Sequence, residues 1–104
     1  MTDDVVCERK FHTTVDGEVL PILVQWMKPT TDGLHWCCDY SIAWPDRPVR
    51  RFHAMGVDSA QALILALHMV SAELETASSP VRWFDNEADL GLPAFEAEGD
   101  GEPG

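Results

Sequence analysis

Three polar residues at alternate positions, His35, Cys37 and Asp39, are the part of this chain that comes closest to a metal site. Alternate residues of a strand point to the same face, so their side chains would form one row. Imidazole, thiol and carboxylate groups are ligands for soft divalent metals. The paired ligand spacing of a zinc site is missing, however, so we expect the solvent-facing side of a strand, with no bound metal or other cofactor.

A cysteine nucleophile is the second chemistry that the residue types allow. Cys37 or Cys38 could act with a histidine that folding brings near, if the thiol pKa were lowered and a third group oriented the histidine. Cys38 lies on the apolar face predicted for its strand and is expected to be an inert core residue. Cys37 has no activating signature near it, and phosphate loops, metalloprotease motifs and nucleophile elbows are all missing. No catalytic residue is therefore assigned.

Residues suited to binding a partner are easier to find. Trp44 stands beside Pro45 at a predicted strand end, and tryptophan is enriched at interface hot spots. The acidic residues Asp85, Glu87 and Asp89 follow Arg82, after which the chain has no lysine or arginine. We predict that Trp44 and these three carboxylates contact a protein partner.

The charge of the chain limits the kinds of partner. Eighteen acidic residues against seven basic ones give a net charge of −11. Such a polyanion repels nucleic-acid phosphates and anionic membrane surfaces, so we expect neither as a partner. Two interpretations stay open: the charge serves solubility, or it attracts a basic partner.

Cysteine usage and the first residues bear on the compartment. Three cysteines, two of them adjacent, make a poor disulfide framework. The acidic start of the chain lacks a secretory pattern, and the longest apolar-rich run is too short to span a bilayer. These features predict a cytoplasmic protein with reduced thiols.

Alternating apolar residues predict strands over residues 5–15, 18–28, 34–44 and, more weakly, 49–55. Asp16-Gly17 suits a hairpin turn, Pro21 suggests a strand edge or bulge, and residues 29–33 form a turn cluster. Residues 81–84 could add a short final strand. Residues 1–93 are predicted to form one domain, followed by an acidic tail, residues 94–104, that is expected to be disordered.

One helix is predicted from about residue 58 to Thr76. Asp58 is expected to be its N-cap, and Gln61 completes a pairing like that of a capping box. The predicted sheet-facing stripe consists of Leu63, Ala66, Leu67, Val70 and Leu74, with Ser71 on the opposite side. Further apolar residues beside this stripe suggest either burial under the C-terminal segment or contact with another chain.

The chain resembles a family of small uncharacterised bacterial domains of unknown function. The resemblance rests on the alternating Trp36, Cys38, Tyr40 and Ile42, on the helix-start motif Gly56-Val57-Asp58-Ser59-Ala60-Gln61-Ala62-Leu63, on Trp83, and on Leu90-Gly91-Leu92-Pro93. It implies a bacterial protein with a core of one sheet and one helix, and it implies no activity.

Together these patterns predict an α+β fold, in which a mostly antiparallel sheet of about four strands is covered by one long helix and a returning C-terminal segment. The predicted function is that of a non-enzymatic protein-binding domain, most concretely an immunity-type inhibitor of a basic toxin. The alternatives are a homodimeric structural or adaptor domain and, less in keeping with the residues, a small-ligand-binding protein or enzyme.

Overall fold

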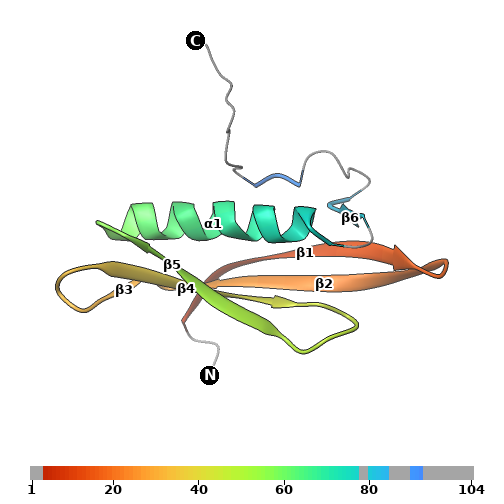
Figure 1. Ribbon diagram of the computed structural model, residues 1–104, viewed down its shortest axis with the longest axis horizontal. Coiled ribbons are helices and arrows are strands. Elements are labelled where there is room, and N and C mark those ends of the chain that lie inside the picture. Colours follow the sequence, from red (N-terminus) through yellow and green to blue (C-terminus); the bar gives the residue numbers. More distant parts are fainter. Residues whose placement is uncertain (1–3, 78–79, 85–89, 93–104) are drawn as a thin grey trace, which may run out of the picture.

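The computed structural model describes residues 4–77, 80–84 and 90–92. They form an α+β fold in which one helix lies along one face of an antiparallel sheet (Figure 1). The strands and the helix are, in chain order, β1 (Val5–Val15), β2 (Glu18–Met27), β3 (Thr30–Thr31), β4 (Trp36–Ala43), β5 (Arg50–Gly56), α1 (Ser59–Glu75) and β6 (Val81–Arg82).

The four long strands form a meander in the order β1, β2, β4, β5, each antiparallel to the one before it. Asp16 and Gly17 both have positive φ, as the two-residue hairpin between β1 and β2 requires. The pairs between β2 and β4 begin at Leu23, so Pro21 needs no ladder hydrogen bond on that side. The predicted antiparallel sheet and the hairpin are confirmed.

Two short strands bring the sheet to six, where about four were predicted. β3 pairs with the start of β4, in a segment that the sequence had suggested was only a turn. β6 pairs with His12 and Thr13 of β1, at the opposite edge of the sheet. β6 falls within the short final strand suggested for residues 81–84, whereas β3, two residues long, is too short for alternation to be recognised in a sequence.

β4 begins two residues later than predicted. The Asp32 carboxylate accepts hydrogen bonds from the backbone N–H groups of Leu34 and His35, at 2.8 and 2.9 Å. This local turn holds both residues outside the strand, and Leu34 is 82% exposed rather than part of the apolar face. The predicted row of His35, Cys37 and Asp39 is therefore wrong, because His35 lies in the turn.

The start of α1 is fixed by its neighbours in sequence. The Asp58 carboxylate accepts from the Gln61 N–H at 2.7 Å, and the Gln61 side chain accepts from the Val57 N–H at 2.7 Å. The predicted N-cap and its pairing with Gln61 are confirmed. Just before the cap, a Cβ on Gly56 would lie 2.6 Å from the backbone nitrogen of Ala62, so the strand and the helix meet closely there.

The buried stripe of α1 differs from the predicted one. It consists of Ala62, Ala66, Val70, Ser71 and Leu74, whereas Leu63 and Leu67 are only half-buried beside it. Alanine at the first two positions lets the helix axis approach β4 and β5, on which it mainly packs. Ser71 was expected on the exposed side of the helix but is only 5% exposed. The helix is therefore also covered on a side other than the one that faces the sheet.

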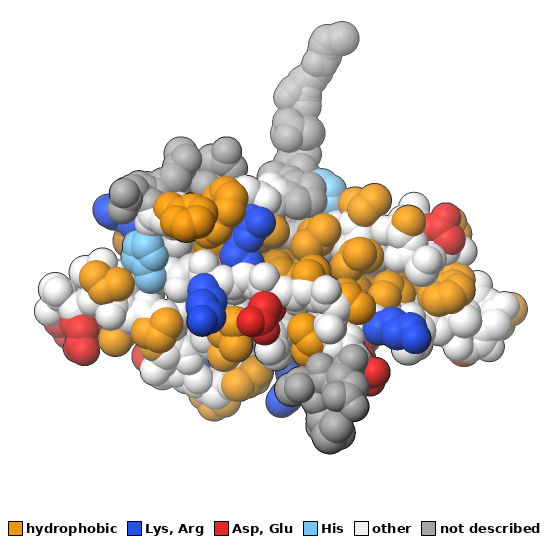
Figure 2. Space-filling model, turned by 180° about the vertical axis from the view of Figure 1, so that it is seen from behind, with side chains coloured by type: hydrophobic (Ala, Val, Ile, Leu, Met, Phe, Trp, Pro, Cys, Tyr) orange, Lys and Arg blue, Asp and Glu red, His pale blue; other side chains and the backbone are white. Residues whose placement is uncertain are grey.

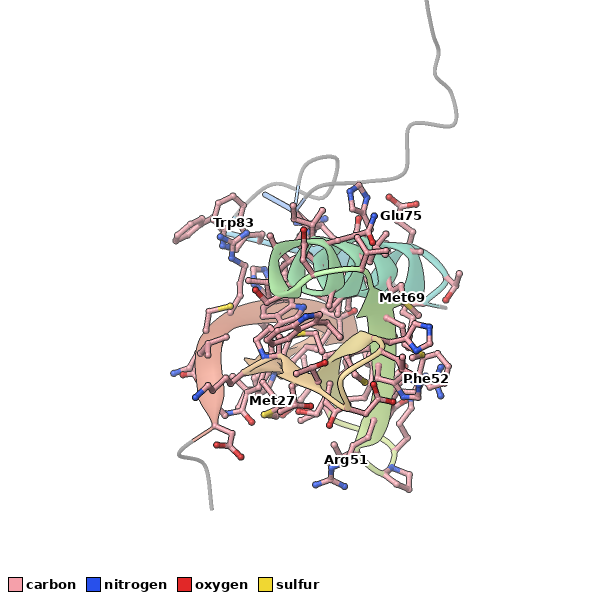
Figure 3. All side chains as sticks on the ribbon, turned by 90° about the vertical axis from the view of Figure 1, so that its left-hand side faces the viewer. Met27, Arg51, Phe52, Met69, Glu75 and Trp83 are labelled. Atoms are coloured by element: carbon pink, nitrogen blue, oxygen red, sulfur yellow. The ribbon has the colours of Figure 1, made fainter. Side chains whose placement is uncertain are left out.

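On the face of the sheet that carries α1, the half nearer β1 is covered by the returning C-terminal segment. Trp83, Leu90 and Leu92 pack against the core, and in Figure 3 Trp83 lies on the β1 side while Met69 lies on the β5 side. Arg9 holds this segment: its guanidinium donates to the carbonyl oxygens of Leu90 and Gly91, both at 2.9 Å, and stacks 4.0 Å from the Trp83 ring centroid. Arg9, which interrupts the apolar pattern of β1, thus joins the two ends of the domain.

We expect Gly56→Ala to lower the free energy of unfolding by about 1–3 kcal/mol, the usual cost of overpacking, because the new methyl group meets the backbone of α1. Urea unfolding followed by circular dichroism measures this. The control is Val57→Ala, at the exposed neighbouring residue, which should change stability by less than about 0.5 kcal/mol. Equal stability of the two variants would contradict the close approach.

We expect Arg9→Met to lower the free energy of unfolding by about 1–3 kcal/mol, because the variant keeps the apolar stem but loses two charged hydrogen bonds and the ring contact. The exposed neighbour Lys10 provides the matched control, Lys10→Met. Limited proteolysis should cut the Arg9 variant faster than the control after Trp83. Identical melts and digestion patterns would show that Arg9 does not hold the segment.

Candidate functional site

One face of the sheet is covered by α1 and the C-terminal return, and no described element lies across the other face (Figure 1). We call this second side the outer face. Strand pairing and alternation assign to it Glu8, Lys10 and His12 of β1; Val19, Pro21, Leu23, Gln25 and Met27 of β2; Cys37, Asp39, Ser41 and Ala43 of β4; and Arg51, His53 and Met55 of β5. Figure 3 shows Met27 and Arg51 on the side away from the helix.

A cluster of Cys37, Asp39 and His53 lies on the outer face. Asp39 and His53 are directly opposite each other on β4 and β5, and Cys37 is two residues before Asp39, on the same face. The candidate ligand atoms of the three side chains all lie within 4.8 Å of one another. The sequence pattern included Cys37 and Asp39 but missed His53, since only the pairing of β4 with β5 brings this residue to them.

The Cys37 thiol is not activated as a nucleophile. Its Sγ lies 3.6 Å from an Asp39 carboxylate oxygen, to which the thiol donates. Burial and, after it, the negative charge of Asp39 raise the pKa of Cys37 above its ordinary value. Although folding brings His53 near, a raised thiol pKa is the opposite of what cysteine catalysis needs.

The other two thiols are also in their protonated form at neutral pH. Burial raises the pKa of Cys38 to about 11, with a smaller contribution from Asp39, and Cys38 points into the core as predicted. Burial also raises the pKa of Cys7, against a lowering by Arg9. All three cysteines are free, which agrees with the expectation of no disulfide framework.

A hollow of about 340 Å³ adjoins the cluster on the outer face. Asp39, Ser41, Arg51, His53 and Met27 contribute to its lining, together with Tyr40 and Phe52. The hollow is open to solvent, and its walls combine one carboxylate, one guanidinium and one imidazole with the thioether of Met27. It gives a small molecule or a partner's side chain access to Asp39 and His53.

The strand that carries His53 and Arg51 is tied to the helix from the opposite face. Glu73 of α1 forms an ion pair with Arg50 of β5 at 2.8 Å and accepts a hydrogen bond from the Tyr40 hydroxyl of β4. Burial, and then the hydrogen bond to Glu73, raise the pKa of Tyr40. This network holds β4, β5 and α1 together, so the outer-face side chains of β5 project from a fixed strand.

Apolar side chains run along the outer face of β2, beside the polar cluster. Val19, Pro21, Leu23 and Met27 lie on this face, while Ile22, Val24 and Trp26 of the same strand are buried on the other. Residues 19–24 are consequently a continuous apolar run, a pattern typical of strands buried on both faces. This run was the sequence signal for the outer face, and alternation alone missed it.

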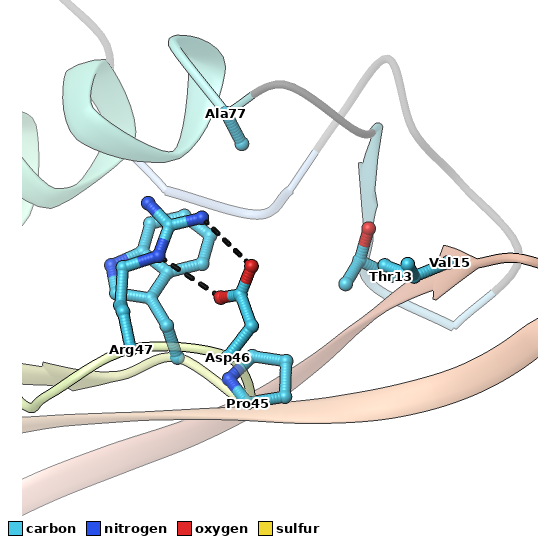
Figure 4. A pocket seen from close by; sticks show the side chains of 7 residues that line it. Thr13, Val15, Pro45, Asp46, Arg47 and Ala77 are labelled. Atoms are coloured by element: carbon cyan, nitrogen blue, oxygen red, sulfur yellow. Dashed lines mark hydrogen bonds and ion pairs between the residues drawn. The ribbon is translucent and has the colours of Figure 1, made fainter.

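Trp44, predicted to contact a protein partner, is half-buried against the core. The Arg47 guanidinium stacks 4.7 Å from its ring centroid and is held there by an ion pair with Asp46 at 3.0 Å (Figure 4). The cavity beside Trp44 measures about 20 Å³, room for about one water molecule. Asp85, Glu87 and Asp89 lie outside the described residues, as does the predicted tail of residues 94–104.

The acidic excess is carried mainly by residues outside the described ranges. The described ranges contain ten acidic and all seven basic residues, a net charge of −3, so the remaining −8 belongs to residues 1–3, 85–89 and 93–104. On the side shown in Figure 2, acidic and basic side chains are interspersed and form no acidic patch. The sheet and the helix are therefore far less charged than the chain as a whole.

Residues 7–94 match the family described as "Domain of unknown function (DUF6968)", and the chain belongs to this family. No curated protein and no solved structure matches it. The matched range contains every strand from Cys7 onward, the helix and the segment that Arg9 holds. Among the described residues, no helix combines the length and apolarity that a membrane crossing requires.

We expect Asp39→Asn to speed alkylation of Cys37 by iodoacetamide roughly two- to tenfold in reduced, metal-free protein at mildly alkaline pH. The substitution removes the negative charge that raises the thiol pKa, and each pKa unit changes the thiolate fraction about tenfold. Peptide mass mapping follows each cysteine separately. Cys7 is the internal control, because burial and Arg9 rather than Asp39 set its pKa. An unchanged Cys37 rate would contradict the assigned role of Asp39.

Proposed function

We propose that this member of the family is a protein-binding domain whose contact surface is the outer face of the sheet. The observation that carries the proposal is that β2 is apolar on both faces, although the described chain covers only one of them. Strands with this pattern are normally covered on both sides, because exposed apolar surface is costly in water. A partner protein would supply the missing cover.

The outer face has the composition of a contact surface. An apolar stripe on β2, including Val19 at 64% exposure near the β1–β2 hairpin, is bordered by charged and polar side chains of β1 on one side and, from Leu23 onward, by β4 and then β5 on the other. Protein interfaces commonly combine an apolar centre with a polar rim. Met55, 50% exposed at the end of β5, extends the apolar surface beyond the polar cluster.

The size of the outer face fits this role. Four strands about 4.8 Å apart, with about eight paired residues rising roughly 3.3 Å each, span roughly 500 Å² before side-chain relief is counted. A standard interface covers about 800 Å² per partner. The flat area of the outer face is thus about half of a standard contact area or somewhat more, and side-chain relief and the bordering loops add to it.

The charge of the chain favours a basic partner, most concretely a toxin that an immunity-type inhibitor would neutralise. The outer face itself is nearly balanced, with Glu8 and Asp39 against Lys10 and Arg51. Attraction would come instead from the acidic residues of 85–89 and 94–104, which can raise the association rate without touching the central contact. Apolar contacts on β2 would then set the dissociation rate.

Binding suits the site better than catalysis does. The thiol nearest a histidine has a raised pKa, and the hollow beside it is open rather than water-excluding. The chemistry of the described outer face is that of recognition, with side chains of both charges beside apolar ones.

A homodimer is the second candidate, and one observation favours it. With two acidic and two basic side chains, the outer face could meet a second copy through opposite charges, as a two-fold interface requires. Sedimentation equilibrium separates the candidates: a mass that stays at 11.6 kDa across a wide concentration range would exclude the dimer.

We expect the double variant Val19→Glu, Leu23→Glu to lose the partner, because two charges replace apolar side chains of the β2 stripe on the outer face. The control is Val57→Glu, Ile64→Glu, which adds the same charge at exposed positions on and just before α1. Wild type and both variants are immobilised equally and exposed to a lysate of the native cells, and bound proteins are quantified by mass spectrometry.

The expected result is a basic protein that wild type and the helix control retain and that the outer-face variant loses at least about tenfold, since two apolar contacts of the β2 stripe are replaced by charges. Circular dichroism melts confirm that both variants are folded. A protein retained equally by all three, or lost equally by both variants, would overturn the assignment of the contact to the outer face.

A further inference from the structure

We propose that Cys37, Asp39 and His53 form a binding site for one divalent cation of the zinc class. This inference is independent of the proposed function, since it concerns a cation rather than a protein. It departs from the expectation drawn from the sequence, which was that no metal binds, because the structure places His53 rather than His35 beside Cys37 and Asp39.

The three side chains already lie close to the positions that a cation would impose. Zinc binds sulfur at about 2.3 Å and nitrogen or oxygen at about 2.0–2.2 Å, so the ligand atoms of a tetrahedral site lie roughly 3.3–3.7 Å apart. The Cys37 Sγ and the Asp39 carboxylate oxygen are 3.6 Å apart. All ligand atoms of the three residues lie within 4.8 Å of one another, so His53 has to approach by about 1.5 Å at most.

That approach requires little rearrangement. His53 is exposed, so a rotation of its side chain moves the imidazole without disturbing the core. The backbone positions are fixed, because Asp39 and His53 are opposite each other in a paired ladder and Cys37 occupies the next outer-face position on β4. Ligands placed on strands are held more accurately than ligands placed on loops.

The chemistry of the three groups selects the metal. One sulfur, one nitrogen and one oxygen ligand favour zinc and its neighbours over magnesium or calcium, which prefer all-oxygen sites. On binding, the Sγ–H bond of Cys37 breaks, the proton passes to solvent and an Sγ–metal bond forms. The thiolate and the Asp39 carboxylate then balance the two positive charges of the cation, so the bound site adds no net positive charge beside the guanidinium of Arg51.

Three protein ligands leave one position of a tetrahedral site open. Asp39 and His53 also line the hollow of about 340 Å³ on the outer face, so solvent can reach this position. A water molecule, or a side chain of a protein docked on the outer face, would complete the coordination. Zinc sites with three protein ligands and an open position exchange their fourth ligand, whereas sites closed by four protein ligands serve structure alone.

Cobalt titration tests the site, since a cobalt–thiolate bond gives a charge-transfer band in the near ultraviolet. Chelator-treated, reduced protein is titrated with Co²⁺ and then with Zn²⁺, which should displace it. We expect one ion per chain. Cys37→Ser should abolish the band, and Asp39→Asn and His53→Gln should each weaken binding at least about tenfold.

Matched controls are Cys7→Ser, which removes an exposed thiol on β1, and His35→Gln, which removes the histidine of the turn before β4. Both should bind the ion like wild type. The proposal is overturned if wild type shows no cobalt–thiolate band, if the band survives Cys37→Ser, or if His35→Gln weakens binding as much as His53→Gln. Loss of a protein partner by the outer-face variant, with the cobalt site intact, would separate this proposal from the proposed function.

Discussion

In the described part of the chain, one helix of 17 residues has to cover the sheet, and most features of this domain depend on that constraint. Such a helix is about 25 Å long and 10 Å wide, whereas four strands span about 19 Å. It therefore covers β4 and β5, and alanines at positions 62 and 66 let it lie close to them. The rest of the face that carries α1 is covered by the C-terminal return. Arg9 holds this segment in place through its hydrogen bonds and its contact with the Trp83 ring.

The same constraint leaves the outer face without cover. No further described segment is available for it, yet β2 carries apolar side chains on that side as well. The two proposals for this domain both start from here. The apolar stripe of β2 suits a protein partner, and the cluster of Cys37, Asp39 and His53 suits a cation at the β4–β5 end of the same surface. A partner seated on the stripe would border the open coordination position.

The acidic excess and the exposed apolar surface lie in different parts of the chain. The described residues carry a net charge of −3, and the larger acidic excess belongs to the start of the chain and to segments after Phe84. Long-range attraction and close contact can therefore be carried by different parts of the chain. Charges interact over distances of about 8 Å at physiological salt and affect mainly the association rate. Apolar side chains contribute only in direct contact and affect mainly the dissociation rate.

The sequence by itself determined the local structure. The alternation of β1, β2 and β4, the Asp16-Gly17 hairpin, the Asp58 cap and the antiparallel α+β class all follow from interactions between residues close in the chain. The tertiary structure decided the rest. The Asp32 carboxylate holds His35 in a turn outside β4. The pairing of β4 with β5 places His53 beside Cys37 and Asp39 instead. Which residues lie opposite each other on β4 and β5 depends on the register of the two strands and on the turn that joins them, so the candidate site could be found only after these strands were paired.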